Sequence, residues 1–314
     1  MNCPVCGSTK VGVIQNSWDD RYGYPGQFCL LRCVSCTHVF MDCDFTASQL
    51  MDLYTNYYPR KTFDLTQYKP HTESGGLGAW FCGLNASAFR GVPRNVRVLD
   101  VGCGFGQSLG YHTARGCDVY GVEADENITR VAEKFGYKVH VGLFDDSVYE
   151  ARFFDYITMD QVIEHVIDPV STLRGVARIL KPGGTVILST PNASGWGARV
   201  FGRRWINWHS PYHVQFFSRR SMRIAAEQAG LIVAEVKTVT NSEWLNYQWI
   251  HLATYPSPGK PSRFWLPNYQ GGLVQSRILK ILATMHRVKI NHLLTRVFDS
   301  VGLGDNCLFV LKRP

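Results

Sequence analysis

Short apolar runs alternate with stretches of helical periodicity from about residue 96 to the end of the chain. Buried strands are predicted at 97–101 and 118–123, where β-branched and other apolar residues cluster. Five further strands are predicted, at 138–141, 155–159, 185–189, 231–239 and 306–311. Helices are expected between them, among them 127–135 and a helix that Ser218 caps and that ends near Gly230. Strands that alternate with helices are typical of an α/β fold with a doubly wound sheet.

The pattern before residue 96 indicates two further units. Residues 1–43 carry two pairs of cysteines, and residues 44–95 form a linker that begins with helical spacing. Three tyrosines of this linker either close over a ligand as a lid or pack in the interior: Tyr54, Tyr57 and Tyr58. The sheet domain comprises residues 96–314, with an insertion at 240–301 between its last two strands.

The first segment holds two CxxC pairs that 26 residues separate: Cys3, Cys6, Cys33 and Cys36. Each pair can place two thiolates on one ion, and four sulfur ligands in a tetrahedron suit zinc. Such a closed site leaves no position for a substrate, so the zinc of this predicted zinc ribbon is expected to be structural. The alternative is a set of buried free cysteines. Cys29 and Cys43 are either substitute ligands or small buried apolar residues.

Composition narrows the class of protein. Apolar residues make up 45% of the 314 residues and charged residues 18%, which excludes a disordered or fibrous chain. No run of 18 uncharged apolar residues occurs and no signal-peptide pattern is present, so a soluble cytoplasmic protein with reduced cysteines is expected. The net charge of +8 favours an anionic partner, which could be nucleic acid, a nucleotide-linked substrate or a membrane surface.

The turn after the first strand has the pattern of a ligand site. Gly102, Gly104 and Gly106 lie between that strand and a helix, where bare backbone lets a ligand approach the helix N-terminus. Asp100 precedes the turn, and Glu123, 23 residues further on, ends the second strand, where an acid can bind ribose hydroxyls. The spacing departs from the dinucleotide fingerprint, and an acid beside the turn would repel a pyrophosphate. A ligand that carries a cation is therefore expected.

These residues resemble the class I S-adenosylmethionine-dependent methyltransferases. Residues 98–106 are similar to the first motif of that family, 154–165 to its fourth-strand motif, and 180–184 to the turn before its fifth strand. The resemblance covers about residues 96–239 and the final strand. It implies a seven-stranded Rossmann-like sheet with an antiparallel last strand, bound S-adenosylmethionine and no metal in the chemistry.

The resemblance also implies roles for individual residues. Glu123 would bind the ribose, Phe144 and Asp145 would lie at the adenine, and Asp160 or Gln161 would contact the methionyl end. The Glu164-His165 pair would shape the cofactor pocket. The expected cofactor-binding residues are therefore Asp100, Gly102, Gly104, Gly106, Glu123, Phe144, Asp145, Asp160, Gln161 and His165.

A zinc ribbon ahead of such a core is also similar to bacterial methyltransferases of sugar and polysaccharide biosynthesis. Those that methylate carbon carry a large second lobe after the core, for which this chain ends too early. The expected acceptor is therefore a small molecule with a hydroxyl group, such as a sugar, a nucleotide-sugar or a related biosynthetic intermediate.

A hydroxyl acceptor must lose a proton, and the base is expected beyond strands four and five. His213 is the predicted general base and His209 the second candidate, because an imidazole in a loop rich in aromatic residues can accept that proton near neutral pH. The alternative is that His213 only holds the loop in place by hydrogen bonding.

The insertion at 240–301 has seven Lys and Arg against Glu243 and Asp299. Its second half, 273–298, places apolar residues at approximate helical spacing with basic residues between them. Three interpretations remain open: a roof over the acceptor cleft, which we favour, a dimer interface, and a helix that lies on an anionic membrane.

Two other functions compete with small-molecule methylation. The zinc ribbon and the basic charge suggest an RNA methyltransferase. Nucleic acid is nevertheless not expected as the partner, because the ribbon contributes only Lys10, Arg21 and Arg32 and no base-flipping motif occurs. The third function is a non-catalytic scaffold that uses the zinc ribbon for interaction.

Overall fold

The computed structural model of the chain describes residues 1–314 except 44, 47–48, 50–51, 59–63, 74 and 266–272. Within the described part, the strands form a large sheet in the order β10-β11-β8-β7-β4-β5-β6 and a small sheet in the order β1-β2-β3-β9. The large sheet consists of β4 (Arg97–Val101), β5 (Asp118–Glu123), β6 (Lys138–Val141), β7 (Phe154–Asp160), β8 (Leu180–Pro191), β10 (Ile232–Thr238) and β11 (Asn306–Lys312). The predicted α/β fold and its seven strands are confirmed.

The pairing of the large sheet matches the implied topology. β4 pairs in parallel with β5 and with β7. The pairs β5–β6 and β7–β8 are also parallel. The last strand, β11, is antiparallel to both of its neighbours, β8 and β10. The carboxyl ends of the parallel strands therefore meet at one edge of the sheet, where ligands bind in folds of this kind.

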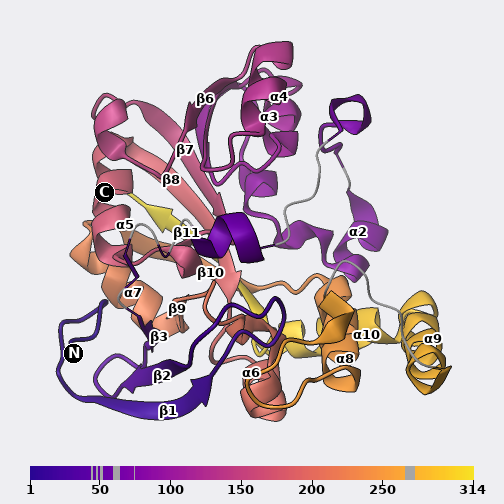
Figure 1. The fold of residues 1–314 in the computed structure, drawn as a ribbon. Helices are drawn as coiled ribbons and strands as arrows, with labels where there is room; N and C mark the ends of the chain where they lie inside the picture. Colours follow the sequence, from indigo (N-terminus) through magenta and orange to yellow (C-terminus); the bar gives the residue numbers. More distant parts are fainter. Residues whose placement is uncertain (44, 47–48, 50–51, 59–63, 74, 266–272) are drawn as a thin grey trace.

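Helices cover both faces of the large sheet, as Figure 1 shows. α5 (Pro169–Ile179) and α7 (Arg219–Gln228) lie together on one face, and α3 (Gln107–Thr113) and α4 (Ile128–Phe135) lie on the other. Their apolar sides are buried against the strands, for example at Leu173, Met222 and Leu109. Ser218 caps α7 as predicted, since its side chain accepts a hydrogen bond from the Ser221 N–H.

The small sheet joins the N-terminal segment to the core. It consists of β1 (Val11–Ser17), β2 (Phe28–Cys33), β3 (Val39–Asp42) and β9 (Gln215–Phe216). β9 comes from the core, and Val39 of β3 pairs with Phe216. His38 strengthens this junction, because its Nε2 lies 2.8 Å from Oε1 of Gln215 in a fully buried position. The N-terminal segment is therefore joined to the core through a shared sheet.

Two details differ from the expected elements. The segment 181–184, expected as a turn, belongs to β8, because the Gly183 N–H donates to Arg313 O and the Arg313 N–H donates to Gly184 O. The stretch 273–298, expected as one helix, forms α9 (Leu273–Arg287) and α10 (Ile290–Ser300). Lys289 separates them with a φ of 71°, a left-handed conformation that a continuing helix cannot contain.

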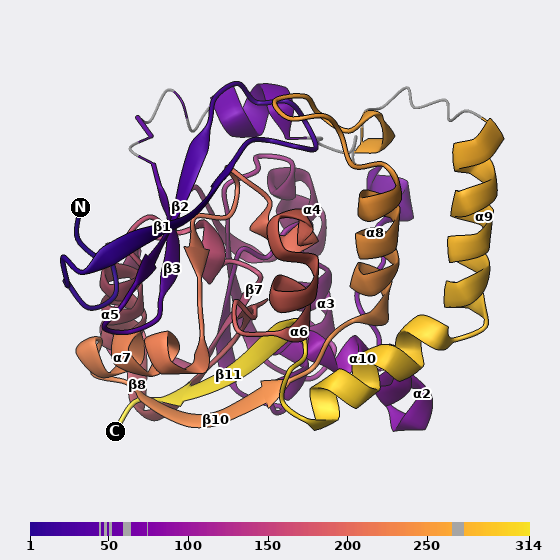
Figure 2. The same cartoon turned by 90° about the horizontal axis from the view of Figure 1, so that it is seen from below.

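The remaining elements connect these units. The insertion also contains α8 (Ser242–Ala253), which packs against α9 and α10 (Figure 2). The other short elements are η1 (Leu53–Tyr57), η2 (Leu65–Gln67), α2 (Gly76–Cys82), η3 (Leu84–Ala86), η4 (Ala88–Gly91), η5 (Asp146–Val148), η6 (Ile163–His165), α6 (Trp196–Phe201), η7 (Gly202–Arg204), η8 (Ile206–Trp208) and η9 (Arg263–Trp265). Among the described residues, none of these helices combines the length and the apolar character needed to cross a membrane.

Candidate functional site

The glycine turn lies at the carboxyl edge of the large sheet, directly after β4. Gly102, Gly104 and Gly106 have φ angles of 74°, 55° and 77°, which glycine adopts without strain. A Cβ at Gly102 would lie 2.5 Å from Cγ2 of Val162, so the backbone there is in close contact with the segment after β7. A Cβ at Gly104 would meet nothing within 4 Å, and the space over the turn is open to a ligand.

Glu123 holds this turn in place from the end of β5. Its Oε2 accepts a hydrogen bond of 2.8 Å from the Gly104 N–H, and its Oε1 accepts one of 2.9 Å from the Asp125 N–H. The carboxylate thereby links the glycine turn to the loop after β5. Each oxygen keeps a second lone pair that a ligand hydroxyl could use.

Asp100 lies beneath the turn and is buried. Its Oδ1 accepts a hydrogen bond of 2.6 Å from Thr158 Oγ1, and its Oδ2 accepts one from Ser108 Oγ at the start of α3. Burial raises the pKa of Asp100 to about 6, although these two hydrogen bonds act in the opposite direction. Asp100 therefore joins β4, β7 and α3 beneath the turn.

The predicted adenine residues follow β6. The Gly142 N–H donates to the backbone oxygen of Glu123 at 2.8 Å, which brings this loop beside the end of β5. Phe144 is half-buried, and Asp145 is exposed. The Asp145 carboxylate accepts a hydrogen bond of 2.9 Å from the Ser147 N–H, and hydrogen bonds from Ser147 lower its pKa.

Asp160 and Gln161 end β7 and line a cavity of about 370 Å³. Asp160 accepts a hydrogen bond from Ser189 Oγ, and Nε2 of Gln161 donates to Ser189 Oγ and to Asn306 Oδ1, each at 2.8 Å. Burial raises the pKa of Asp160 above its ordinary value, while the Ser189 hydroxyl and the positive charge of Arg90 oppose this shift. These residues connect the ends of β7 and β8 with the start of β11.

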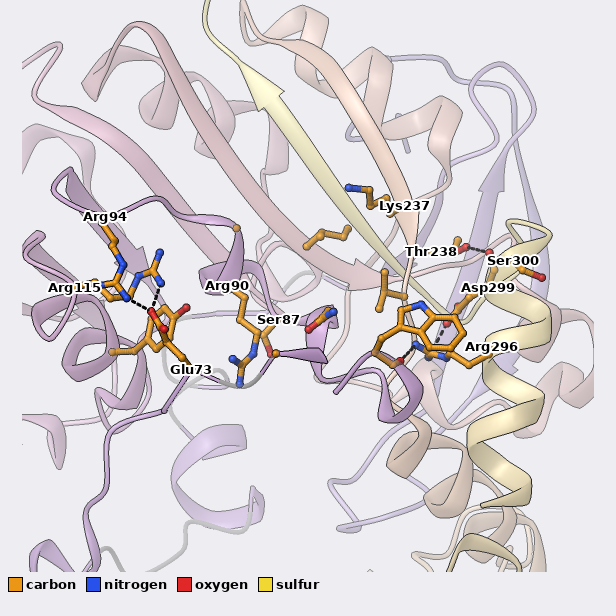
Figure 3. Close-up of a pocket in the computed structure, with 17 residues that line it drawn as sticks. Glu73, Ser87, Arg90, Arg94, Arg115, Lys237, Thr238, Arg296, Asp299 and Ser300 are labelled. Carbon is orange, nitrogen blue, oxygen red and sulfur yellow. Dashed lines mark hydrogen bonds and ion pairs between the residues drawn. The ribbon is translucent and has the colours of Figure 1, made fainter. Parts of the chain in front are cut away.

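A larger cavity of about 1020 Å³ lies beside the first one, and Ser87 and Arg90 line both. Figure 3 shows Arg90 and Ser87 between two groups of charged side chains. One group is Glu73 with Arg94 and Arg115, which form ion pairs with it, and the other is Lys237, Arg296 and Asp299. Five cations against two acids make the lining of this cavity basic.

Arg90 differs from the other cations of this lining because it forms no ion pair with a described residue. Its Nη1 donates to Thr72 O at 3.3 Å, and its guanidinium lies 5.0 Å from the ring centre of Phe89. Its Nε is buried and has no hydrogen-bond partner among the described residues. No motif surrounds Arg90 in the sequence, so residue pattern alone does not mark it as a site residue.

The predicted bases lie in a cluster that contains the buried Glu164 and the half-buried His165, His209 and His213. Nδ1 of His213 donates to Asn207 O and Nδ1 of His165 to Tyr212 O, both at 2.8 Å, and the rings of His165 and His213 lie 4.8 Å apart. The Glu164 carboxyl accepts a hydrogen bond of 3.0 Å from Thr190 Oγ1. Neither His209 nor His213 lines the two cavities described above, but Asn207 lines the smaller one.

Burial governs the charge of this cluster. It lowers the pKa of His213 well below the ordinary value and that of His165 to about 4, while it raises the pKa of Glu164 to about 8. All three groups are therefore uncharged near pH 7. A solvated His213 would titrate between pH 5 and 8. At this position His213 is not expected to titrate in that range.

An aromatic cluster adjoins the histidines and combines three separate parts of the chain. Tyr22 of the N-terminal segment lies 5.7 Å from Tyr58 of the linker and 5.6 Å from Tyr212, and the rings of Tyr58 and Tyr212 lie 5.2 Å apart. His209 contacts Tyr22 at 5.7 Å. Of the tyrosines considered as a lid, Tyr58 thus packs above the histidine cluster. The side chain of Tyr54 lies outside the described residues.

The four predicted zinc ligands converge at the end of the small sheet. Sγ of Cys3 lies 3.5 Å from Sγ of Cys36, and the same distance separates Cys6 from Cys33. Ligands placed about 2.3 Å from a central zinc in a tetrahedron are about 3.8 Å apart, so the donor set fits this ion. Among the described residues, these cysteines and the set of Glu164, His165 and His213 are the groups of three or more possible ligand residues whose ligand atoms all lie within 4.8 Å of one another.

Of the insertion, α8 and α10 line the cavities, and only the α10 part of the expected roof 273–298 is among the lining residues. Asn241 and Trp244, at the start of α8, line the smaller cavity, and Arg296, Asp299 and Ser300 of α10 line the larger one. None of the described side chains of α9 lines either cavity. The break at Lys289 separates α9 from α10, and the roof over an acceptor cleft stays a prediction.

The chain is similar to proteins of known kind over this core. A family model described as methyltransferase domain matches residues 59–236. A ubiquinone biosynthesis O-methyltransferase of Aromatoleum aromaticum is 33% identical over 184 residues, which are 54% of this chain and 76% of that protein. A protein with the same description from Thiobacillus denitrificans is 32% identical over 157 residues, which are 46% of this chain and 68% of that protein. The geranyl diphosphate C-methyltransferase structure from Streptomyces coelicolor A3(2) aligns with a TM-score of 0.46 and 17% identity, over 71% of this chain and 75% of that chain.

Proposed function

The chain belongs to the methyltransferase domain family and is an S-adenosylmethionine-dependent methyltransferase, and on that premise we propose that it methylates a hydroxyl oxygen of a small molecule. The observation that carries this proposal is the position of the glycine turn. With Glu123 beside it, the turn opens at the same sheet edge as the cavity lined by Asp160 and Gln161. A cofactor over the turn and an acceptor in the cavity would meet at this edge.

The residues present fit S-adenosylmethionine. Gly104 leaves open space over the turn, and Glu123 presents carboxylate oxygens at the position where an acid binds ribose hydroxyls. Phe144 and Asp145 would hold the adenine, and Asp160 or Gln161, at the carboxyl end of β7, would contact the methionyl end. When bound, S-adenosylmethionine supplies a methyl group that its positive sulfonium activates.

Asp100, Gln161 and His165 would act by shaping this pocket. Asp100 joins the strand to α3 through Ser108, and Gln161 is fixed by Ser189 and Asn306. His165 is fixed by the backbone of Tyr212. Because these side chains are buried or bound to the protein, their contribution is to keep the pocket in its binding shape.

The acceptor would lie in the smaller cavity. Arg90, which lines both cavities, would stand between this acceptor and the larger cavity. A small molecule with an anionic or polar end could place that end beside Arg90, whose Nε has no partner among the described residues. Its hydroxyl would then point toward Asp160 and Pro191, at the ends of β7 and β8. Such alignment is the main requirement for attack on a methyl group that is already activated.

His213 remains the proposed base, with His209 as the second candidate. Since the Nδ1–H of His213 donates to Asn207 O, its Nε2 carries the lone pair. The low pKa makes this imidazole a weak base that stays uncharged through neutral pH. It would assist proton removal from a hydroxyl next to Asn207, which lines the cavity.

The names of the relatives favour oxygen as the methylated atom, because they are O-methyltransferases of ubiquinone biosynthesis. The narrower sugar-linked acceptor rests on the zinc ribbon ahead of the core alone. A radiolabelled methyl-transfer assay with purified protein decides between the classes, with sugar nucleotides, phenolic hydroxyls and RNA as separate acceptors. Methyl transfer to RNA alone would replace this proposal by RNA methylation. If calorimetry detects no binding of S-adenosylmethionine, the remaining interpretation is the non-catalytic scaffold.

The four N-terminal cysteines would hold one structural zinc ion. All ten cysteines lie in the described part of the chain and none is in a disulfide, so the four predicted ligands have their sulfur atoms available for a metal. A tetrahedral site of four thiolates would stabilise the small sheet and, through β9, the loop that carries His209 and His213.

A further inference from the structure

The outer faces of α9 and α10 expose apolar side chains that the cavities do not use. On α9, and just after it, they are Ile278, Ile281 and Val288, with 40%, 62% and 57% of the side chains exposed. On α10 they are Ile290, Leu293 and Val297, with 41%, 59% and 52% exposed. Figures 1 and 2 place α9 at the edge of the molecule, with α8 between it and the core. We call these six residues the outer apolar face.

The spacing of these residues gives each helix an apolar side that faces away from its neighbours. Ile278 and Ile281 stand three residues apart, and Leu293 and Val297 stand four apart, so each pair lies on one side of its helix. By contrast, Leu279 and Leu282 of α9, which packs against α8 and α10, are half-buried. α9 thus has one apolar side for the protein and another that is exposed.

The charge around this face has one sign. Residues 244–298 contain seven Lys and Arg and no Asp or Glu. Four of these cations are exposed on or directly after α9, namely Arg277, Lys280, Arg287 and Lys289, and none of them forms an ion pair with a described residue. Of the two flanking acids, Asp299 forms an ion pair with Arg296 and accepts a hydrogen bond from Thr240, and the exposed Glu243 lies at the start of α8.

We propose that the outer apolar face and these four cations bind an anionic membrane surface. Exposed isoleucine, leucine and valine side chains can enter the boundary between headgroups and acyl chains, while lysine and arginine attract anionic headgroups. The helices would lie on the membrane, since no described helix is long and apolar enough to cross it.

Charge is also the reason for choosing a membrane over a second copy of the chain. Two copies joined through this face would bring eight of these exposed cations together, four from each copy, with no acid from residues 244–298. Like charges at an interface oppose association, whereas anionic lipid supplies the missing counter-charge. This inference does not depend on which acceptor is methylated.

The test is flotation of the purified full-length protein with vesicles of phosphatidylcholine alone or with 30% phosphatidylglycerol. We expect binding to the anionic vesicles only, and release as sodium chloride rises from 50 to 500 mM. The double variants Ile278→Ser/Ile281→Ser and Arg277→Gln/Lys280→Gln should each weaken binding about tenfold or more. The matched controls change exposed residues elsewhere, Val13→Ser/Val148→Ser and Lys134→Gln/Arg223→Gln, and should bind as the unchanged protein does.

Circular dichroism and S-adenosylmethionine binding check that each variant is folded. Absence of binding to anionic vesicles would overturn the proposal, and so would binding that the α9 variants leave unchanged. Light scattering after gel filtration tests the alternative that a second copy of the chain covers this face. A dimer that Ile278→Ser/Ile281→Ser dissociates would show that a second copy covers this face and would also overturn the proposal.

Discussion

The side-chain Oε2 of Glu123 accepts a hydrogen bond of 2.8 Å from the backbone N–H of Gly104. Glu123 ends β5, and Gly104 lies in the turn after the neighbouring strand β4, so this bond holds the glycine turn against the end of β5. One carboxylate therefore shapes the turn and is available to a ligand hydroxyl at the same place.

Glu123→Ala should weaken S-adenosylmethionine binding measured by calorimetry. The substitution removes a charged hydrogen-bond acceptor, which contributes about 1.5–3 kcal/mol. Glu126→Ala, which changes an exposed acid at the start of α4, is the control and should bind normally. Equal affinity for both variants would show that the pocket has been placed at the wrong strand end.

Cys3→Ser or Cys36→Ser should reduce the zinc content from about one ion per chain and lower the thermal midpoint. Each variant removes one of four thiolates, and binding of a structural metal contributes directly to folding. Elemental analysis and a thermal melt measure the two effects. Cys29→Ser, near the second pair but outside the cluster, should keep both values. A zinc-free preparation with full stability would contradict a structural ion.

Arg90→Gln should raise the KM for the acceptor and leave the affinity for S-adenosylmethionine near its original value. Arg90 lines both cavities and, unlike the other cations of the larger lining, forms no ion pair with a described residue. Arg94→Gln is the control, because the more exposed Arg94 forms an ion pair with Glu73. Steady-state kinetics on both variants decide whether Arg90 serves the acceptor.

His213→Ala should lower turnover about tenfold or more without changing S-adenosylmethionine affinity, since a positioned base typically contributes ~10²–10⁴-fold. Burial lowers the pKa of His213 well below its ordinary value, so the rate should show no step from this residue between pH 5 and 8. If His209→Ala abolishes turnover and His213→Ala does not, the role belongs to His209. Normal rates for both variants would mean that the reaction needs alignment only.

Asp305→Asn should alter the pH dependence of stability. Burial raises the pKa of Asp305 from its ordinary 3.8 to about 7 in the folded protein. The folded state favours the protonated form of this buried carboxyl. The contribution of Asp305 to the free energy of unfolding is therefore fully present below about pH 4 and is lost as the pH rises through about 7. Urea unfolding should therefore show Asp305→Asn gaining on the order of 2–4 kcal/mol relative to the unchanged protein between pH 4 and pH 8. Asp145→Asn, at an exposed carboxyl, should show no such gain.

The sequence by itself determined the features that short stretches of chain encode. The strands around Asp100 and Glu123, the left-handed turn of Gly102 and Gly104, and the cap at Ser218 all follow from residue type and spacing within a few positions. The family resemblance rests on the same local motifs. The region that the methyltransferase-domain model matches includes these motifs.

Only the tertiary structure decided which distant segments share a surface. The pairing of Val39 with Phe216, the contact of Tyr22 with Tyr212 and the placement of Arg90 between two cavities join residues from separate parts of the chain. The charge state of His213 also depended on packing, because burial sets its pKa and no spacing along the chain reports burial. Local pattern therefore determined the elements and the cofactor turn, whereas long-range contacts determined the acceptor side, since its residues come together only when the chain folds.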